Sequence, residues 1–165
     1  MHPADRLLEW FPECDFAILR HGLAPHGRDY LVVAQIGGVN RAGTHELCFT
    51  HCVEMAYETR VMDDAWVPSW TEEFLDYERW EAAGEPSGYV WGTNWSLAYP
   101  GLTVERNSRR AKSWSRRLGR PMFEVTLETD RFWLRLLFHG LNWRKIDDRT
   151  EPVSRVVIPL EPDGR

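Results

Sequence analysis

The sequence feature that most constrains the fold is a run of alternating side chains from His45 to about Thr59. One set of positions is mainly apolar and the set between them is mainly polar or small: Leu47, Phe49, His51, Val53, Met55 and Tyr57 form the first set, and Glu46, Cys48, Thr50, Cys52, Glu54 and Glu58 form the second. Successive side chains of a strand point to opposite faces. The run therefore predicts one long strand of a half-buried antiparallel sheet, with the first set facing inward.

Shorter apolar runs, separated by turn residues, predict the rest of this sheet. Residues 16–20 and 29–36 are expected to form a hairpin with a longer loop, because glycine and proline lie between them. Residues 122–129 and 132–139 predict a second hairpin, since only the pair Asp130-Arg131 separates them. A final strand is expected from residue 153 to residue 158.

Three segments carry helix signals. Residues 4–11 have apolar side chains at near-helical spacing, and a capping box begins a second helix that runs from Trp70 to about Trp80. The third helix is the best defined: Asn107 or Ser108 caps it, Gly119 ends it, and Ala111, Trp114 and Leu118 form its inward face. The prediction is an α+β fold: a mainly antiparallel sheet of five to seven strands with about three helices packed on one face. It covers residues 1–165 as a single domain, frayed after about residue 159.

Composition excludes several classes of protein. The longest apolar runs, such as 31–34, are far shorter than the roughly 20 residues needed to cross a bilayer, so no membrane span is expected. The net charge of −5 disfavours a general nucleic-acid binder. Cys14, Cys48 and Cys52 make an odd cysteine count, and no secretory signal precedes them, so the cytoplasm is the expected location. The oligomeric state stays open.

Sequence motifs favour a non-enzymatic role without settling the question. The chain has no G-x-S-x-G elbow, no H-E-x-x-H pair, no Walker loop and no dinucleotide fingerprint. His45, Cys48, His51 and Cys52 are residue types that bind zinc. On a single strand, however, the two cysteines point away from the two histidines, so neither a metal site nor a cofactor is predicted.

Charge is strongly polarised along the chain. Residues 61–105, here called the acidic segment, hold nine acidic residues and the single base Arg79, whereas residues 106–120 hold seven bases and no acid. Each stretch can be a solvated helix face, and the two faces can lie near each other and partly neutralise each other's charge. Alternatively, the acidic and aromatic residues bind a basic protein; the contact candidates are Trp70, Glu72, Glu73, Asp76, Tyr77 and Glu78. A third hypothesis, phosphate contact by the basic helix, ranks lower.

Aromatic residues suggest a second kind of site. Tyr89, Trp91 and Trp95 could line a cleft for a small ligand, with His21 or His51 as acid or base, although such aromatic residues more often belong to a core. A small-ligand-binding protein, or an enzyme with such a cleft, is therefore the alternative function.

Several short phrases of the sequence resemble the YxiG-like family of small bacterial proteins. They are His21-Gly22, Arg28-Asp29-Tyr30, Phe49-Thr50-His51-Cys52-Val53, Tyr89-Val90-Trp91-Gly92 with Trp95, and Tyr99-Pro100-Gly101-Leu102. The resemblance runs from about residue 5 to residue 140. It names no catalytic residue, because the family has no established activity. The founding member lies near a polymorphic toxin and its protective genes, which implies an immunity-like or toxin-associated role.

Overall fold

The computed structural model describes residues 16–37, 42–60, 77–82, 84 and 95–146. Within them the elements in chain order are β1 (Phe16–Leu23), β2 (Tyr30–Ile36), β3 (Gly43–Thr50), β4 (Glu54–Thr59), α3 (Tyr77–Ala82), β5 (Ser96–Val104), α4 (Arg109–Leu118), β6 (Phe123–Thr129), β7 (Phe132–Phe138) and β8 (Gly140–Ile146). The predicted helix over 4–11 and the predicted strand over 153–158 lie outside the described residues. Of the predicted helix over 70–80, only the part from Tyr77 is described, where it belongs to α3.

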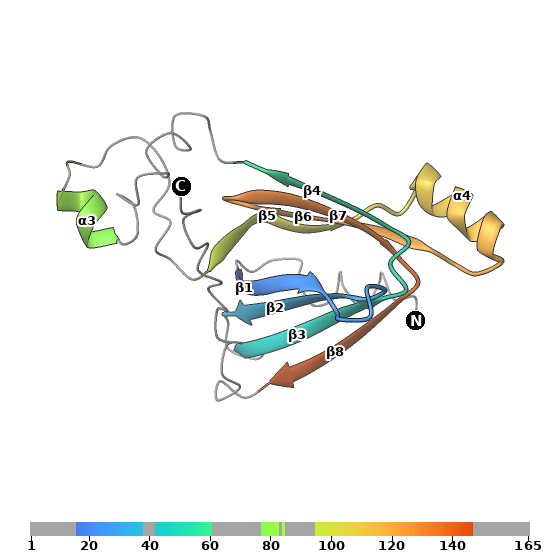
Figure 1. Ribbon diagram of the computed structural model, residues 1–165, viewed down its shortest axis with the longest axis horizontal. Helices are drawn as coiled ribbons and strands as arrows, with labels where there is room; N and C mark the ends of the chain where they lie inside the picture. The colour runs from blue at the N-terminus through green and yellow to red at the C-terminus, as the bar shows by residue number, and fades with distance from the viewer. Residues whose placement is uncertain (1–15, 38–41, 61–76, 83, 85–94, 147–165) are drawn as a thin grey trace, which may run out of the picture.

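The strands form one eight-stranded antiparallel sheet in the order β4-β7-β6-β5-β1-β2-β3-β8. The sheet bends between β5 and β1, so β4, β7, β6 and β5 lie over β1, β2, β3 and β8 (Figure 1). We call these groups the β4 half and the β8 half.

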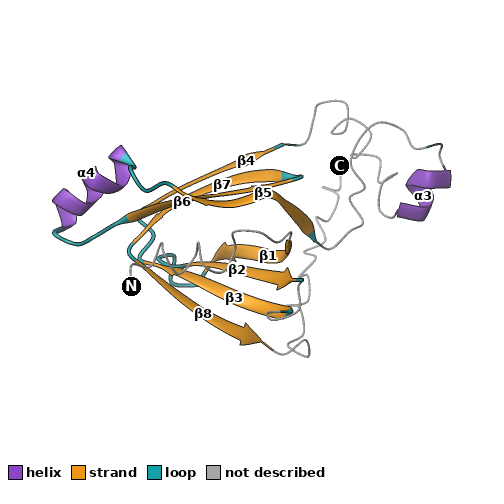
Figure 2. Cartoon of the chain, turned by 180° about the vertical axis from the view of Figure 1, so that it is seen from behind, coloured by secondary structure: helices purple, strands orange, loops and turns teal. Residues whose placement is uncertain are grey.

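The α+β prediction is wrong. The described residues form eight strands and two helices, and those helices do not make a layer on one face (Figure 2). The apolar surface of each half is buried by the other half, so helices are not needed to cover it.

The core lies between the two halves. The ring of Phe49 on β3 meets that of Phe138 on β7 edge to face, with 5.0 Å between their centroids. Leu47, Leu134 and Leu136 are buried beside them. This packing joins strands that are distant in the sheet order into one apolar cluster.

The long strand predicted from His45 to Thr59 is two strands. β3 pairs with β2 and β8 in one half, and β4 pairs with β7 at the free edge of the other half. The chain passes between the halves at residues 51–53, where His51 has a positive φ of 54°. The alternation gives no sign of this break, because Leu47 on β3 and Met55 on β4 both face the space between the halves.

The predictions that rest on local sequence signals, two hairpins and one helix, are confirmed. Both predicted hairpins are present, as β1 with β2 and β6 with β7. The helix predicted after Ser108 is α4, which ends at Leu118 with Gly119 in the left-handed conformation. The strands β5 and β8 were not predicted. β5 contains Pro100 and has a register shift between Ala98 and Gly101, and both features weaken a strand pattern.

A bulge in β1 decides which of its side chains enter the core. The pairing of β1 with β2 shifts between Ile18 and Arg20, so Leu19 is an extra residue. Without this shift Arg20 would lie opposite Val32, a core residue; with it, His21 takes that place. The bulge therefore brings an imidazole, and not a guanidinium, between the two halves.

Candidate functional site

The basic helix α4 is fixed at its first turn by a serine. Ser108 is the N-cap: its Oγ accepts a hydrogen bond from the Ala111 backbone N–H at 2.9 Å. The same hydroxyl donates to the buried carboxylate of Glu124 on β6. Arg135 on β7 approaches this carboxylate, with 3.7 Å between Nε and Oε1. One side chain thus caps the helix and links it to the outer face of the β4 half.

A second carboxylate holds the helix further along. Glu54 on β4 accepts a hydrogen bond from the Trp114 indole N–H at 3.0 Å and forms an ion pair with Arg110. The indole hydrogen bond, together with Arg110 and Arg135 nearby, lowers the pKa of Glu54 despite an opposing effect of burial. Glu54 of the sheet thus neutralises part of the charge of α4.

Other bases of α4 remain on its solvent side. Arg109, Lys112 and Arg116 lie three and four residues apart, so they share one face, and all three are exposed. Arg117 is engaged differently, because its guanidinium stacks over the Trp114 ring at 3.9 Å. The helix therefore presents a row of cations beside an anchored face.

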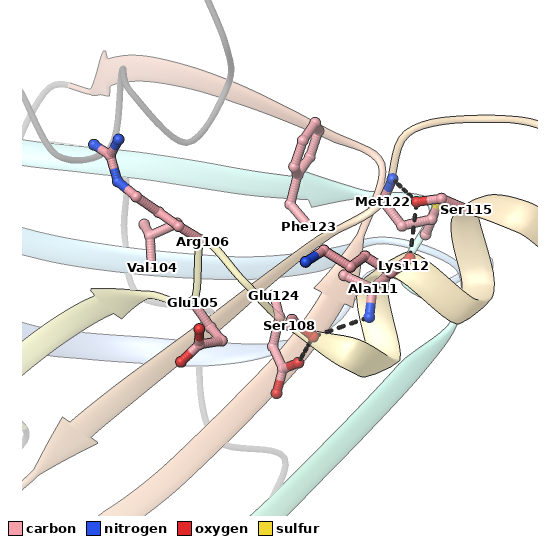
Figure 3. A pocket seen from close by; sticks show the side chains of 10 residues that line it. All are labelled: Val104, Glu105, Arg106, Ser108, Ala111, Lys112, Ser115, Met122, Phe123 and Glu124. Atoms are coloured by element: carbon pink, nitrogen blue, oxygen red, sulfur yellow. Dashed lines mark hydrogen bonds between the residues drawn. The ribbon is translucent and has the colours of Figure 1, made fainter.

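A pocket of about 330 Å³ lies between the first turns of α4 and the adjoining ends of β5 and β6 (Figure 3). We call it the α4 pocket. Its lining combines apolar, hydroxyl and charged side chains: Val104, Glu105, Arg106, Ser108, Ala111, Lys112, Ser115, Met122, Phe123 and Glu124. No sequence motif indicated it, because its residues come together only when α4 folds back against β6.

The predicted protein-contact residues are only partly described. Trp70, Glu72, Glu73 and Asp76 lie outside the described residues. Tyr77 and Glu78 begin α3, where the side chains of Glu78 and Glu81 are exposed. Figures 1 and 2 show α3 and α4 at opposite ends of the molecule. These two helices therefore do not neutralise each other by contact.

Of the residues predicted to line a ligand cleft, the structure describes His21, His51 and Trp95, which lie in different surroundings. His21 faces the space between the two halves. Trp95 is exposed, and so is Leu97, which follows it on β5 opposite Ala17. His51 is exposed in the connection between β3 and β4, where its backbone N–H donates to Asp29. Tyr89 and Trp91 lie outside the described residues.

His21 is enclosed by aromatic rings. Its Nδ1 is hydrogen-bonded to the Tyr30 hydroxyl at 2.7 Å, and its ring lies 4.4 Å from that of Phe132 and 5.8 Å from that of Tyr57, centroid to centroid. Burial lowers the pKa of His21. Burial, with Tyr57 and Cys52 nearby, raises the pKa of Tyr30 to about 12. Both groups are therefore neutral near pH 7, and the pair serves the packing between the halves.

Cysteine and histidine side chains of β3 and the following turn are also engaged in the fold. Cys52 donates to the Phe49 carbonyl, and burial is the main cause that raises its pKa to about 12. The Trp143 indole N–H donates to His45 Nδ1 at 2.9 Å. Among the described residues, no group of three or more His, Cys, Asp or Glu side chains could hold a metal ion. In the same part of the chain, no helix has the length and apolar character to cross a membrane.

The comparisons with known proteins give one result. A family model described as YxiG-like protein matches residues 4–155, which confirms the resemblance found in the sequence. Neither a curated protein nor a solved structure matches the chain.

Proposed function

The chain belongs to the YxiG-like family, and from this premise we propose that it is a non-enzymatic cytoplasmic protein that binds another protein, in an immunity-type or toxin-associated role. The partner is basic and contacts the acidic segment, with Trp70, Glu72, Glu73, Asp76, Tyr77 and Glu78 as contact residues. Acidic charge raises the rate of association with such a partner, and aromatic side chains slow its dissociation.

The observation that carries this proposal is the separation of charge in space. The carboxylates of Glu78 and Glu81 on α3 are exposed, and the basic helix α4 lies at the other end of the sheet. One base of α4, Arg110, is instead paired with Glu54, which belongs to the sheet. The carboxylates of Glu78 and Glu81 therefore remain available to a basic surface from outside.

The test begins with the partner. The tagged chain is recovered from its own host at low salt, eluted with salt, and its companions are identified by mass spectrometry. We expect a stoichiometric basic protein. With that protein purified, Glu73→Lys/Glu78→Lys should lower the association rate about tenfold or more at low salt.

A matched control distinguishes the effect of charge at the proposed contact residues from the effect of the net charge of the protein. Glu58→Lys/Glu128→Lys makes the same change in net charge on the outer face of β4 and β6, at two positions that are not among the proposed contact residues. This variant should retain most of the association rate. Equal losses in the two double variants, or a partner that is acidic, would overturn the proposal.

A second candidate function, small-ligand binding, is favoured by one observation, the α4 pocket. Its location differs from the aromatic cleft expected from the sequence.

A further inference from the structure

We propose that the α4 pocket binds a small organic anion that carries an apolar group, such as an aromatic carboxylate. This inference goes beyond protein binding, and the pocket lies at the opposite end of the molecule from α3 (Figure 1). Its volume of about 330 Å³ falls at the lower end of the range for small-molecule sites, roughly 300–1,000 Å³.

The carboxylates of the pocket already have donors within the protein. Glu124 accepts from Ser108 and lies near Arg135. Glu105 accepts from the Asn107 backbone N–H at 3.1 Å. A ligand cation would have to share these carboxylates with the donors that they already have, so it would gain less from them than from carboxylates without partners.

Lys112 is in a different situation. Its ammonium group can donate three hydrogen bonds, and the structure gives it one long bond, to Asn107 Oδ1 at 3.5 Å. This ammonium can therefore donate to a ligand anion without losing a strong bond in the protein. The exposed row of Arg109 and Arg116 on the same helix adds positive potential around it.

The two kinds of charge lie on different sides of the pocket. Figure 3 shows Lys112 and Arg106 extending on the side of the Phe123 ring, while the carboxylates of Glu105 and Glu124 point the other way. Phe123 is half-buried, and Met122 and Val104 add further apolar surface. A ring packed on Phe123 would place an attached carboxylate near Lys112. The arrangement thus selects a ligand with both an apolar and an anionic part.

The test uses benzoate as the probe, with benzyl alcohol as its neutral counterpart, in calorimetric or NMR titrations at low salt. We expect saturable binding of benzoate with a Kd of about millimolar, and binding of benzyl alcohol at least about tenfold weaker. Perturbed resonances should include those of Phe123 and Ala111. No saturable binding up to about 20 mM, or equal binding of both probes, would overturn the proposal.

Two variants of the same helix locate the site. Lys112→Met keeps the apolar stem and removes the charge, and should weaken benzoate binding about fivefold or more. Arg116→Met removes one charge from the same face but does not line the pocket, so it should change binding less than about twofold. Both positions are exposed, so both variants should fold. Equal effects would mean a diffuse charge effect and no site.

The pocket and the protein-binding proposal can fail separately. Glu73→Lys/Glu78→Lys should leave the benzoate Kd unchanged, because α3 contributes no residue to the α4 pocket.

Discussion

His21 is an imidazole packed between the two halves of the sheet, against a cluster made mainly of apolar and aromatic side chains. The groups that face it are the Tyr30 hydroxyl from β2, the Tyr57 ring from β4 and the Phe132 ring from β7. None of them carries a charge near neutral pH that would stabilise an imidazolium, since the pKa of Tyr30 is raised to about 12 and burial also raises that of Tyr57. Protonation of His21 therefore opposes the packing of the two halves.

We expect acid to destabilise the protein through this residue. Burial lowers the pKa of His21 from the ordinary value of 6.5, so below about pH 6.5 the unfolded chain binds a proton that the folded chain does not. As the pH is lowered from about 6.5 to the pKa of His21 in the folded protein, the free energy of unfolding should decrease. The decrease should be less than about 1.4 kcal/mol per pH unit. Urea unfolding of the wild type and of His21→Phe between pH 7.5 and 5 measures this, and the variant should lose less stability in acid.

Tyr30→Phe provides the comparison for this experiment. It removes the hydroxyl partner but keeps the imidazole, so its stability should be lower by about 1 kcal/mol at neutral pH and should still fall in acid. If His21→Phe had the same pH dependence as the wild type, the titration of another group would be responsible.

Among the secondary-structure elements, α4 and the strand β4 differ in how far the sequence determines them. α4 could be predicted because its signals are local: Ser108 caps it and Gly119 ends it. The boundary between β3 and β4 could not, because the alternation of apolar residues continues through it and only the pairing with β7 gives β4 its place. The same limit applies to the site. Glu54 was identified as a polar strand residue, but nothing in the sequence places it beside Trp114, 60 positions away.

The capping serine should be the position of α4 that is most sensitive to a small change. Ser108→Ala removes the acceptor for the Ala111 N–H and a donor to the buried Glu124, and should cost about 1–2 kcal/mol in the free energy of unfolding. Ser113→Ala on the exposed side of the same helix should cost less than about 0.5 kcal/mol. Urea unfolding of both variants checks this difference, and similar values for the two would argue against the cap as the anchor of α4.

On the scale of the whole molecule, the chain connects the two halves of the sheet in two places near one end. β3 leads into β4 through residues 51–53, and β7 leads into β8 through His139. These connections are close, because the His139 backbone N–H donates to the Thr50 carbonyl and the Val53 N–H donates to that of Leu137. One apolar cluster takes residues from strands of both halves. Within the described residues, the two halves therefore share one core.

A shared core predicts cooperative unfolding. Phe138 on β7 packs against Phe49 of the opposite half, so Phe138→Ala should cost about 3–5 kcal/mol, a large part of the roughly 5–15 kcal/mol that stabilises a typical domain. Far-UV circular dichroism and tryptophan fluorescence should give one coincident urea transition for the wild type, and both midpoints should shift equally in the variant. Leu118→Ala, an exposed position on α4, should shift them little. A change in a core that both halves share has to affect every probe to the same extent. Two separate transitions would therefore contradict a shared core and show that the halves unfold independently.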